Sequence, residues 1–88
     1  MPTILRKGGF VVKFYGPPRE HPPPHVHVEH GPAELVVIRL RTKDSSQRIW
    51  RAYGMKDSDI VTAYRLVEAH HGRILRAWRK LHGDAQSQ

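Results

Sequence analysis

The ten residues from 21 to 30, His-Pro-Pro-Pro-His-Val-His-Val-Glu-His, constrain this 88-residue chain more than any other segment. Proline has no N–H to give to a β-ladder, and it pushes the residue before it toward extended geometry. The triplet Pro22-Pro23-Pro24 therefore predicts a stiff, polyproline-like arm. Alternating apolar and polar residues follow it, so we expect a β-strand that begins at His25.

The predicted strand has two chemically different faces. Successive side chains of a strand alternate between faces, so Val26 and Val28 point to one side. His25, His27 and Glu29 then point to the other side. Two imidazoles and a carboxylate on one surface form the best candidate for a functional site in this sequence.

Three further segments have the composition of strands, with aromatic and β-branched residues bounded by glycine, proline or polar turn residues. They span residues 10–15, 33–40 and 49–53. The apolar run at 35–38 fits a strand that is covered on both faces. Residues 1–9 are expected to form a short strand or arm that closes in a turn at Gly8-Gly9.

After Gly54 the spacing of apolar residues changes to that of a helix. Seven residues alternate between separations of four and three, which places them on one helical stripe. They are Ile60, Tyr64, Val67, His71, Ile74, Trp78 and Leu81. Residues 57–59, Asp-Ser-Asp, can cap the start of the helix, and Gly83 can end it. The stripe keeps its phase across Gly72, so we expect one long or gently kinked helix rather than a break into two.

These elements predict an α+β domain. We expect a three- or four-stranded antiparallel sheet packed against one long, straight or kinked C-terminal helix that lies across one face. The domain should span residues 1–83, followed by a frayed tail at 84–88. Its expected core consists of Val26, Val28, Leu35, Val37, Ile60, Val67, Ile74 and Trp78. A chain this short buries only roughly 60 to 65% of its unfolded surface, so a homodimer or a hetero-complex is expected.

Amino-acid composition restricts the expected ligands and the expected cellular location of the domain. Fifteen Lys and Arg against eight Asp and Glu give a formal charge of +7, which favours RNA or another polyanion, or an acidic protein partner. There is no cysteine, so disulfides and thiolate metal sites are excluded. No apolar run approaches the roughly 20 residues that span a bilayer, and no signal-peptide core is present. We therefore expect a cytoplasmic protein with no membrane contact.

Three interpretations of the histidine strand stay open. In the first, His25 and His27 are solvated outward positions, or they hydrogen-bond to tie down the proline arm. In the second, His21, His25 and His27 hold a divalent metal, functional or adventitious, with Glu29 or His30 as other donors. In the third, His25 and His27 form a metal-free acid/base pair that acts on a phosphodiester. No cofactor other than such a metal is expected.

The predicted helix also carries a row of cations. They are Arg65, Arg73, Arg76, Arg79 and Lys80, with His82 in the last turn. Such a row is usually a solvated face that keeps a small protein soluble. Non-specific contact with phosphates is the alternative, and Arg76 and Arg79 are its candidate binding residues. On the apolar stripe, His71 is expected to be hydrogen-bonded and Trp78 to belong to the core.

Several of these residues together resemble a known family. The segment Pro-Pro-His-Val-His-Val at 23–28, Ala33, Gly54, and the helical Leu75 and Trp78 are similar to the small bacterial proteins called domain of unknown function 4160. The resemblance covers most of the chain. It implies a compact sheet with a C-terminal helix and no established biochemical activity. It also implies a gene beside that of another small protein, an arrangement reminiscent of toxin–antitoxin pairs.

The sequence therefore favours a small binding protein of the toxin–antitoxin kind that acts on RNA or on a small acidic partner encoded nearby. A metal-independent ribonuclease that uses His25 and His27 is the first alternative, and a histidine-based metal-binding module is the second. The expected working surface is the histidine strand and the proline arm. Its candidate binding residues are His21, Pro23, Pro24, Glu29 and His30, with Arg76 and Arg79 from the helix.

Overall fold

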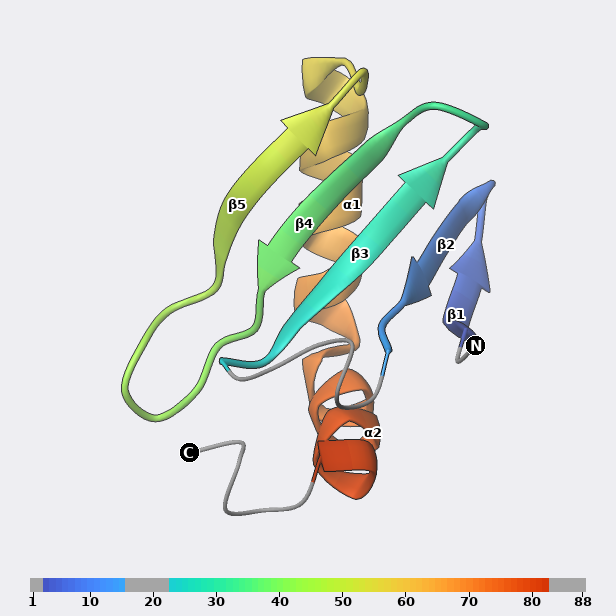
Figure 1. Ribbon diagram of the computed structural model, residues 1–88. Helices are drawn as coiled ribbons and strands as arrows, with labels where there is room; N and C mark the ends of the chain where they lie inside the picture. Colours follow the sequence, from blue (N-terminus) through green and yellow to red (C-terminus); the bar gives the residue numbers. More distant parts are fainter. Residues whose placement is uncertain (1–2, 16–22, 83–88) are drawn as a thin grey trace.

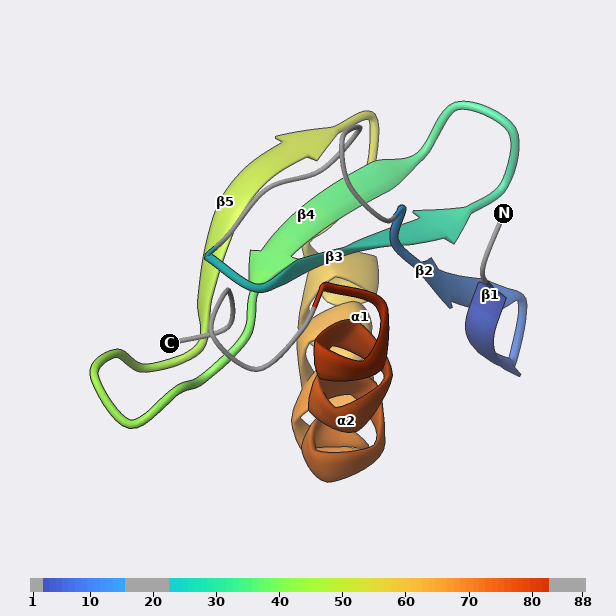
Figure 2. The ribbon, with the colours of Figure 1, turned by 60° about the horizontal axis from the view of Figure 1, so that its bottom comes forward.

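A computed structural model describes residues 3–15 and 23–82 of the chain, and these form two layers. The strands are β1 (Thr3–Lys7), β2 (Phe10–Lys13), β3 (His25–His30), β4 (Leu35–Arg39) and β5 (Arg48–Tyr53), and the helices are α1 (Asp57–Ala69) and α2 (His71–His82). Every strand pairs antiparallel with its neighbour in sequence, in the order β1-β2-β3-β4-β5 (Figure 1). Both helices lie against the same face of the sheet (Figure 2). The predicted α+β class is confirmed.

The sheet has five strands, more than the three or four predicted, because the N-terminal segment pairs with β2 as a full strand. Its turn consists of Gly8 and Gly9, whose φ angles are 58° and 83°. A two-residue hairpin turn of type I′ requires positive φ at both central positions, and glycine adopts this without steric cost. The Gly-Gly pair therefore produces a hairpin, and the expected "strand or arm" is a strand.

The apolar run of β4 splits between the two faces of the sheet. In the register, Val28 lies opposite Val36, and directly opposite residues of an antiparallel pair point to the same face. The residues that β4 contributes to the helix-facing core are therefore Val36 and Ile38. The prediction chose the wrong pair, since Leu35 is only half-buried and Val37 is buried on the opposite face. Four consecutive apolar residues contain no alternation that could fix the phase.

The remaining core predictions fit the structure. The fully buried members of the predicted set are Val26, Val28, Val67, Ile74 and Trp78. Ile60 is partly buried and packs against them. β2 adds Phe10 and Val12 to the core, and the residue after its end adds Phe14. The ring of Phe14 meets that of Trp78 edge-on, with centroids 5.3 Å apart, so α2 packs against the chain where it leaves β2.

The C-terminal segment forms two helices, so the prediction of one long helix was wrong. The break lies at His70, whose φ of −115° and ψ of 22° leave helical geometry. Its Nδ1–H donates to the carbonyl oxygen of Leu66, one turn earlier, at 3.0 Å. The backbone N–H of His70 still donates to the same Leu66 oxygen at 3.2 Å, so the irregularity is confined to the dihedral angles of His70 and does not lie at Gly72.

The buried stripe of α2 ends differently from the prediction. Leu81 is exposed, whereas His82 is almost completely buried. The imidazole of His82 stacks on the indole of Trp78, with centroids 3.6 Å apart and planes 8° apart. Its Nδ1–H also donates to the Trp78 carbonyl oxygen at 3.1 Å. His82 thus belongs to the core and is not a solvated cation of the last turn.

Gly54 connects the sheet to the helices. Its φ is 65°, and a Cβ at this position would lie 2.8 Å from the carbonyl oxygen of Ala33. Only glycine combines this conformation with so close a backbone approach. The first helix then begins at Asp57, within the predicted capping segment, although the N-cap residue Lys56 makes no side-chain cap. Neither α1 nor α2 is long and apolar enough to cross a membrane.

Candidate functional site

The face of the sheet opposite the helices, here called the open face, carries His25 and His27 of β3. Val26 and Val28 are fully buried against the helices, whereas His27 and Glu29 are half-buried on the other side. The predicted alternation of β3 is confirmed. His25 is deeper than expected for an outward position, with only 9% of its surface exposed.

His25 is held by a hydrogen bond and by two indole rings. Its Nδ1–H donates to the carbonyl oxygen of Pro23 at 2.9 Å. Its ring centroid lies 5.2 Å from that of Trp50 and 5.3 Å from that of Trp78. Because a carbonyl can only accept, Nδ1 carries the hydrogen, and the lone pair of the neutral ring lies on Nε2. The contact fastens the proline segment to the strand, which was one of the open alternatives.

The described part of the proline segment is built into the sheet rather than presented to solvent. The Pro24 side chain is fully buried, and its carbonyl oxygen accepts a hydrogen bond from the N–H of Leu40 at 2.9 Å. Pro23 is half-buried. Pro24 therefore stabilises the sheet, contrary to its predicted place on the binding surface. His21 lies outside the described residues, so the metal site predicted for His21, His25 and His27 stays a prediction.

Four rings follow one another across the open face, and we call them the aromatic row: Tyr15, His27, His25 and Trp50. The centroid of Tyr15 lies 6.3 Å from that of His27, which lies 5.7 Å from that of His25. Trp50 follows at 5.2 Å from His25. The row therefore joins the end of β2, the start of β3 and the middle of β5.

Trp50 reaches the row through an irregularity in β5. The register pairs Val37 with Arg51 but Ile38 with Ile49, so Trp50 is an extra residue without a partner in β4. A bulge of this kind turns a side chain away from strict alternation. His25, His27, Val37, Trp50 and Arg51 together line a shallow hollow of about 150 Å³. The sequence did not identify Trp50 or Arg51, because nothing local to 48–53 marks a bulge.

Arginines surround the row, and the one nearby carboxylate of β3 is neutralised. Arg39 lies opposite Arg48 in the register, and Arg51 lines the hollow. The Nζ of Lys13 lies 2.6 Å from a carboxylate oxygen of Glu29, so the predicted binding residue Glu29 is ion-paired. Among the described residues, no acceptor is found for the buried Nε–H of Arg39. The open face therefore offers cations and rings to an anionic partner.

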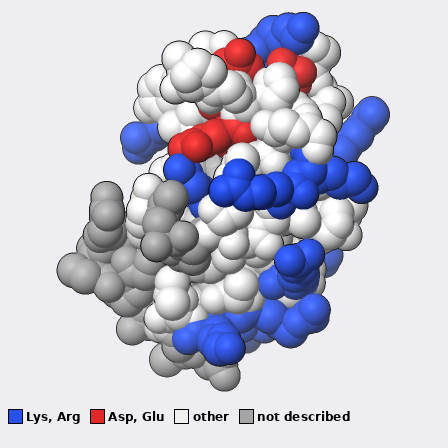
Figure 3. All heavy atoms as spheres, turned by 90° about the vertical axis from the view of Figure 1, so that its right-hand side faces the viewer, with Lys and Arg blue, Asp and Glu red and all other residues white. Residues whose placement is uncertain are grey.

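The cations of the helices lie in the other layer. Arg76 and Arg79 are exposed on α2, so the structure does not bring them onto the open face with His25 and His27. Lys and Arg spread over the middle and lower part of the side that faces the viewer in Figure 3. His71 donates its Nε2–H to the carbonyl oxygen of Arg41 at 2.6 Å, which confirms its predicted hydrogen-bonded role.

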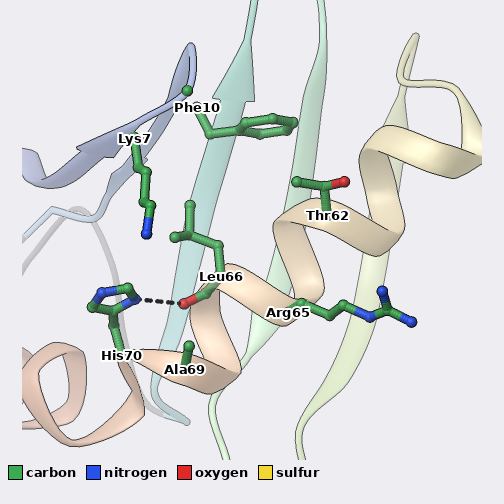
Figure 4. A pocket seen from close by; sticks show the side chains of 8 residues that line it. Lys7, Phe10, Thr62, Arg65, Leu66, Ala69 and His70 are labelled. Atoms are coloured by element: carbon green, nitrogen blue, oxygen red, sulfur yellow. Dashed lines mark hydrogen bonds between the residues drawn. The ribbon is translucent and has the colours of Figure 1, made fainter.

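A second hollow, of about 430 Å³, lies between the β1–β2 hairpin and α1. It is lined by Lys7, Gly8, Phe10, Thr62, Arg65, Leu66, Ala69 and His70. Lys7 extends toward Leu66 and His70, whereas Arg65 extends to the far side of α1 (Figure 4). The hollow has an apolar floor and one cation, Lys7, that extends into it, so it suits a small apolar ligand that carries an anionic group. The sequence did not reveal it, because its walls come from segments far apart in the chain.

The structure separates His30 from the other candidates. Residues 26, 28 and 30 share one face of β3, so His30 lies on the helix side, away from His25 and His27. Its ring stacks on Phe10, with centroids 4.2 Å apart and planes 17° apart. His30 therefore could not supply the third donor to a metal held by His25 and His27.

Comparison with known proteins reaches a family but no activity. No curated protein and no solved structure matches the chain. The model of one family, domain of unknown function (DUF4160), matches residues 9–79. This range includes β2 to β5, α1 and most of α2. The resemblance seen in the histidine strand is thus confirmed, and the chain belongs to the DUF4160 family.

Proposed function

We propose that this protein binds single-stranded RNA on its open face, as the toxin-like member of a pair whose second member is a small acidic protein. The aromatic row carries the proposal. Bases of single-stranded nucleic acid stack on aromatic side chains, each stack contributing about 1 to 3 kcal/mol. Trp50 is 39% exposed, which leaves room for a base beside it.

The charges of the open face support an anionic ligand. Arg39, Arg48 and Arg51 flank the row, and the Arg39 Nε–H has no acceptor among the described residues. Arginine suits phosphate because its planar fork donates two parallel hydrogen bonds.

Cleavage of the bound RNA is the second candidate, and the hydrogen bond of His25 favours it. With Nδ1–H fixed by Pro23, Nε2 is the nitrogen that can accept a proton in the neutral ring. One imidazole would take the proton of the ribose 2′-OH while that oxygen attacks phosphorus. The other, protonated, would give its proton to the 5′-oxygen as the P–O5′ bond breaks. The rings of His25 and His27, 5.7 Å apart, are close enough for both to reach one phosphate.

Fluorescence anisotropy of a labelled single-stranded RNA oligomer tests binding. We expect affinity to fall steeply with added salt, because bound phosphates release counterions. Trp50→Ala should weaken binding by about 5- to 150-fold, which corresponds to one stacked base at about 1 to 3 kcal/mol. Val61→Ala is the control, since Val61 is also an exposed apolar residue but lies on α1.

Charge variants identify the face that binds. Arg51→Ala should weaken binding and lower the salt dependence, whereas Arg76→Ala and Arg79→Ala should change both less. The reverse pattern would place RNA on the helices. Absence of binding even at low salt would leave an acidic protein as the ligand. A ribonuclease would cleave RNA but not its 2′-deoxy analogue, because the 2′-OH is the nucleophile. His27→Ala should abolish that cleavage.

A further inference from the structure

Three potential ligand atoms converge at the far end of β3 from the aromatic row. The Nδ1 of His30 lies 3.0 Å from an Oε1 of Glu34 and 3.5 Å from an Oδ2 of Asp59. All three atoms lie within 4.8 Å of one another. They come from the end of β3, the turn before β4 and the first turn of α1. We propose that these three side chains form a binding site for a divalent transition-metal ion.

The separations suit metal coordination. Zinc binds imidazole nitrogen and carboxylate oxygen at about 2.0 to 2.2 Å. Ligands at that distance stand roughly 3.0 to 3.5 Å apart in octahedral or tetrahedral geometry, given those bond lengths. The two distances from Nδ1 of His30 fall in this range. The separation between the two carboxylates is no more than 4.8 Å, which a rotation of either side chain can shorten.

The fold orients the imidazole before any ligand arrives. One side of the His30 ring stacks on Phe10. Gly9 lies near its other edge, where a Cβ would come 3.4 Å from Cδ2 and 3.5 Å from Nε2 of the ring. Nδ1 consequently points to the carboxylates rather than to the β1–β2 turn. Packing of this kind fixes which nitrogen of a histidine can ligate.

The β3–β4 turn and the helix bring the two carboxylates to it. Gly31 has a φ of 84°, which turns the chain sharply, and the N–H of His30 donates to the carbonyl oxygen of Glu34 at 3.1 Å. Asp59 is fixed in the first turn of α1, where its N–H donates to the carbonyl oxygen of Lys56 at 3.0 Å. Three different elements thus place one donor each.

The site is open on one side. The side chains of His30, Glu34 and Asp59 are 32%, 35% and 19% exposed. Three protein ligands with a solvent-facing side leave positions for water or for a ligand, as in functional rather than structural metal sites. One nitrogen and two carboxylate oxygens suit Zn²⁺, Mn²⁺ or Fe²⁺ better than soft Cu⁺ or the all-oxygen site of Ca²⁺.

A protonated His30 that forms ion pairs with both carboxylates would give the same distances, so the experiment has to distinguish a cation from a proton. Both occupy the same Nδ1 lone pair. The two carboxylates carry two negative charges, which a divalent ion neutralises fully and one imidazolium only by half.

Calorimetric titration of untagged, chelator-treated protein with Zn²⁺ is the test. We expect saturable uptake of one ion per chain and a higher Tm, because a ligand of the folded state stabilises it. Glu34→Gln and Asp59→Asn keep the side-chain shape and should each weaken Zn²⁺ binding by at least about tenfold. The matched controls are Glu68→Gln on α1 and His27→Gln on β3, which should bind as the wild type does.

A second measurement does not depend on variants. Mn²⁺ added to isotopically labelled wild-type protein should broaden the imidazole signals of His30 before those of His25 and His27. Broadening of His25 and His27 first would overturn the proposal and favour a site on the open face. So would weak, multi-site Zn²⁺ uptake, equal loss in the controls, or Glu34→Gln lowering the Tm of metal-free protein while Zn²⁺ adds nothing. RNA binding is measured separately, with the Trp50 and Arg51 variants, so failure of the metal site at His30 would leave that proposal standing.

Discussion

The six residues of β3 divide between two faces of the sheet, and the two faces are stabilised in different ways. On the helix side, Val26 and Val28 are fully buried between neighbouring strands and helices. On the open side, His25 and His27 make contacts with the rings of Tyr15, which follows β2, and of Trp50 in β5; His25 also contacts Trp78 of α2 in the helix layer. The first face is fixed by burial alone. The contacts on the open face depend on which side chains the neighbouring strands place beside the histidines. The chemistry of this face is therefore a property of the whole sheet and not of β3 alone.

Among the variants considered, Val26→Asp should lower the free energy of unfolding most, because it alters the helix-facing side of β3. It places a carboxylate in the fully buried layer, so we expect a loss of at least about 4 kcal/mol, enough to unfold most of the protein. Circular dichroism in a urea titration measures the loss. A folded variant with an unchanged midpoint would mean that the faces of β3 are reversed.

Gly54→Ala should rank second, because this glycine sets how the helices meet the sheet. An alanine there adopts a positive φ and pushes its Cβ to 2.8 Å from the Ala33 carbonyl oxygen. We expect a loss of about 1 to 3 kcal/mol in the free energy of unfolding. Gly72→Ala is the control, since its Cβ would meet only the end of the Arg76 side chain and alanine favours helix. Similar losses in both variants would contradict the role of Gly54.

His25→Ala should have an intermediate effect, because this residue links the two layers. It removes a hydrogen bond to Pro23, with a net contribution of about 0.5 to 1.5 kcal/mol, and leaves a space between two indole rings. We expect a loss of about 1 to 2 kcal/mol in the same urea titration. His25→Asn serves as a partner variant that retains a side-chain donor. A loss below that of His27→Ala would show that the ring contacts contribute nothing.

His27→Ala should have the smallest effect on stability, well under about 1 kcal/mol, because the ring is half-buried on the open face. The same variant should nevertheless reduce RNA affinity, since it removes the second ring of the aromatic row. Denaturation and anisotropy on one sample give both values. A large loss of stability together with intact binding would invert the assignment of roles to the two faces.

The sequence predicted these faces where its pattern is unambiguous. Valine and histidine alternate in β3, so burial could be read directly. In β4 the unbroken apolar run at 35–38 allowed two phases, and only pairing with β3 selects one. The helix stripe stayed in phase across the break, so nothing in the spacing revealed that His70 leaves the helix.

The candidate sites depended more on tertiary structure. Trp50 joins the aromatic row through a bulge, and a bulge is defined by the partner strand rather than by its own sequence. His30, Glu34 and Asp59 meet because a hairpin turn and a helix start are brought together across the sheet. The spacing of these three residues along the sequence does not indicate that they meet in the fold. The sequence therefore indicated which kinds of residue form a site, but not which residues lie next to one another in the fold.

The nearest-neighbour order of the five strands also has a consequence for how the chain reaches its native state. Because each strand pairs with the next one in sequence, every step of sheet assembly closes a loop that is short or of moderate length. The helices must return across most of the chain: α1 reaches the β1–β2 hairpin, and Trp78 of α2 meets Phe14 and His25. In a Trp50→Phe background, the fluorescence of Trp78 should therefore report the docking of the last helix separately from the earlier formation of the hairpins.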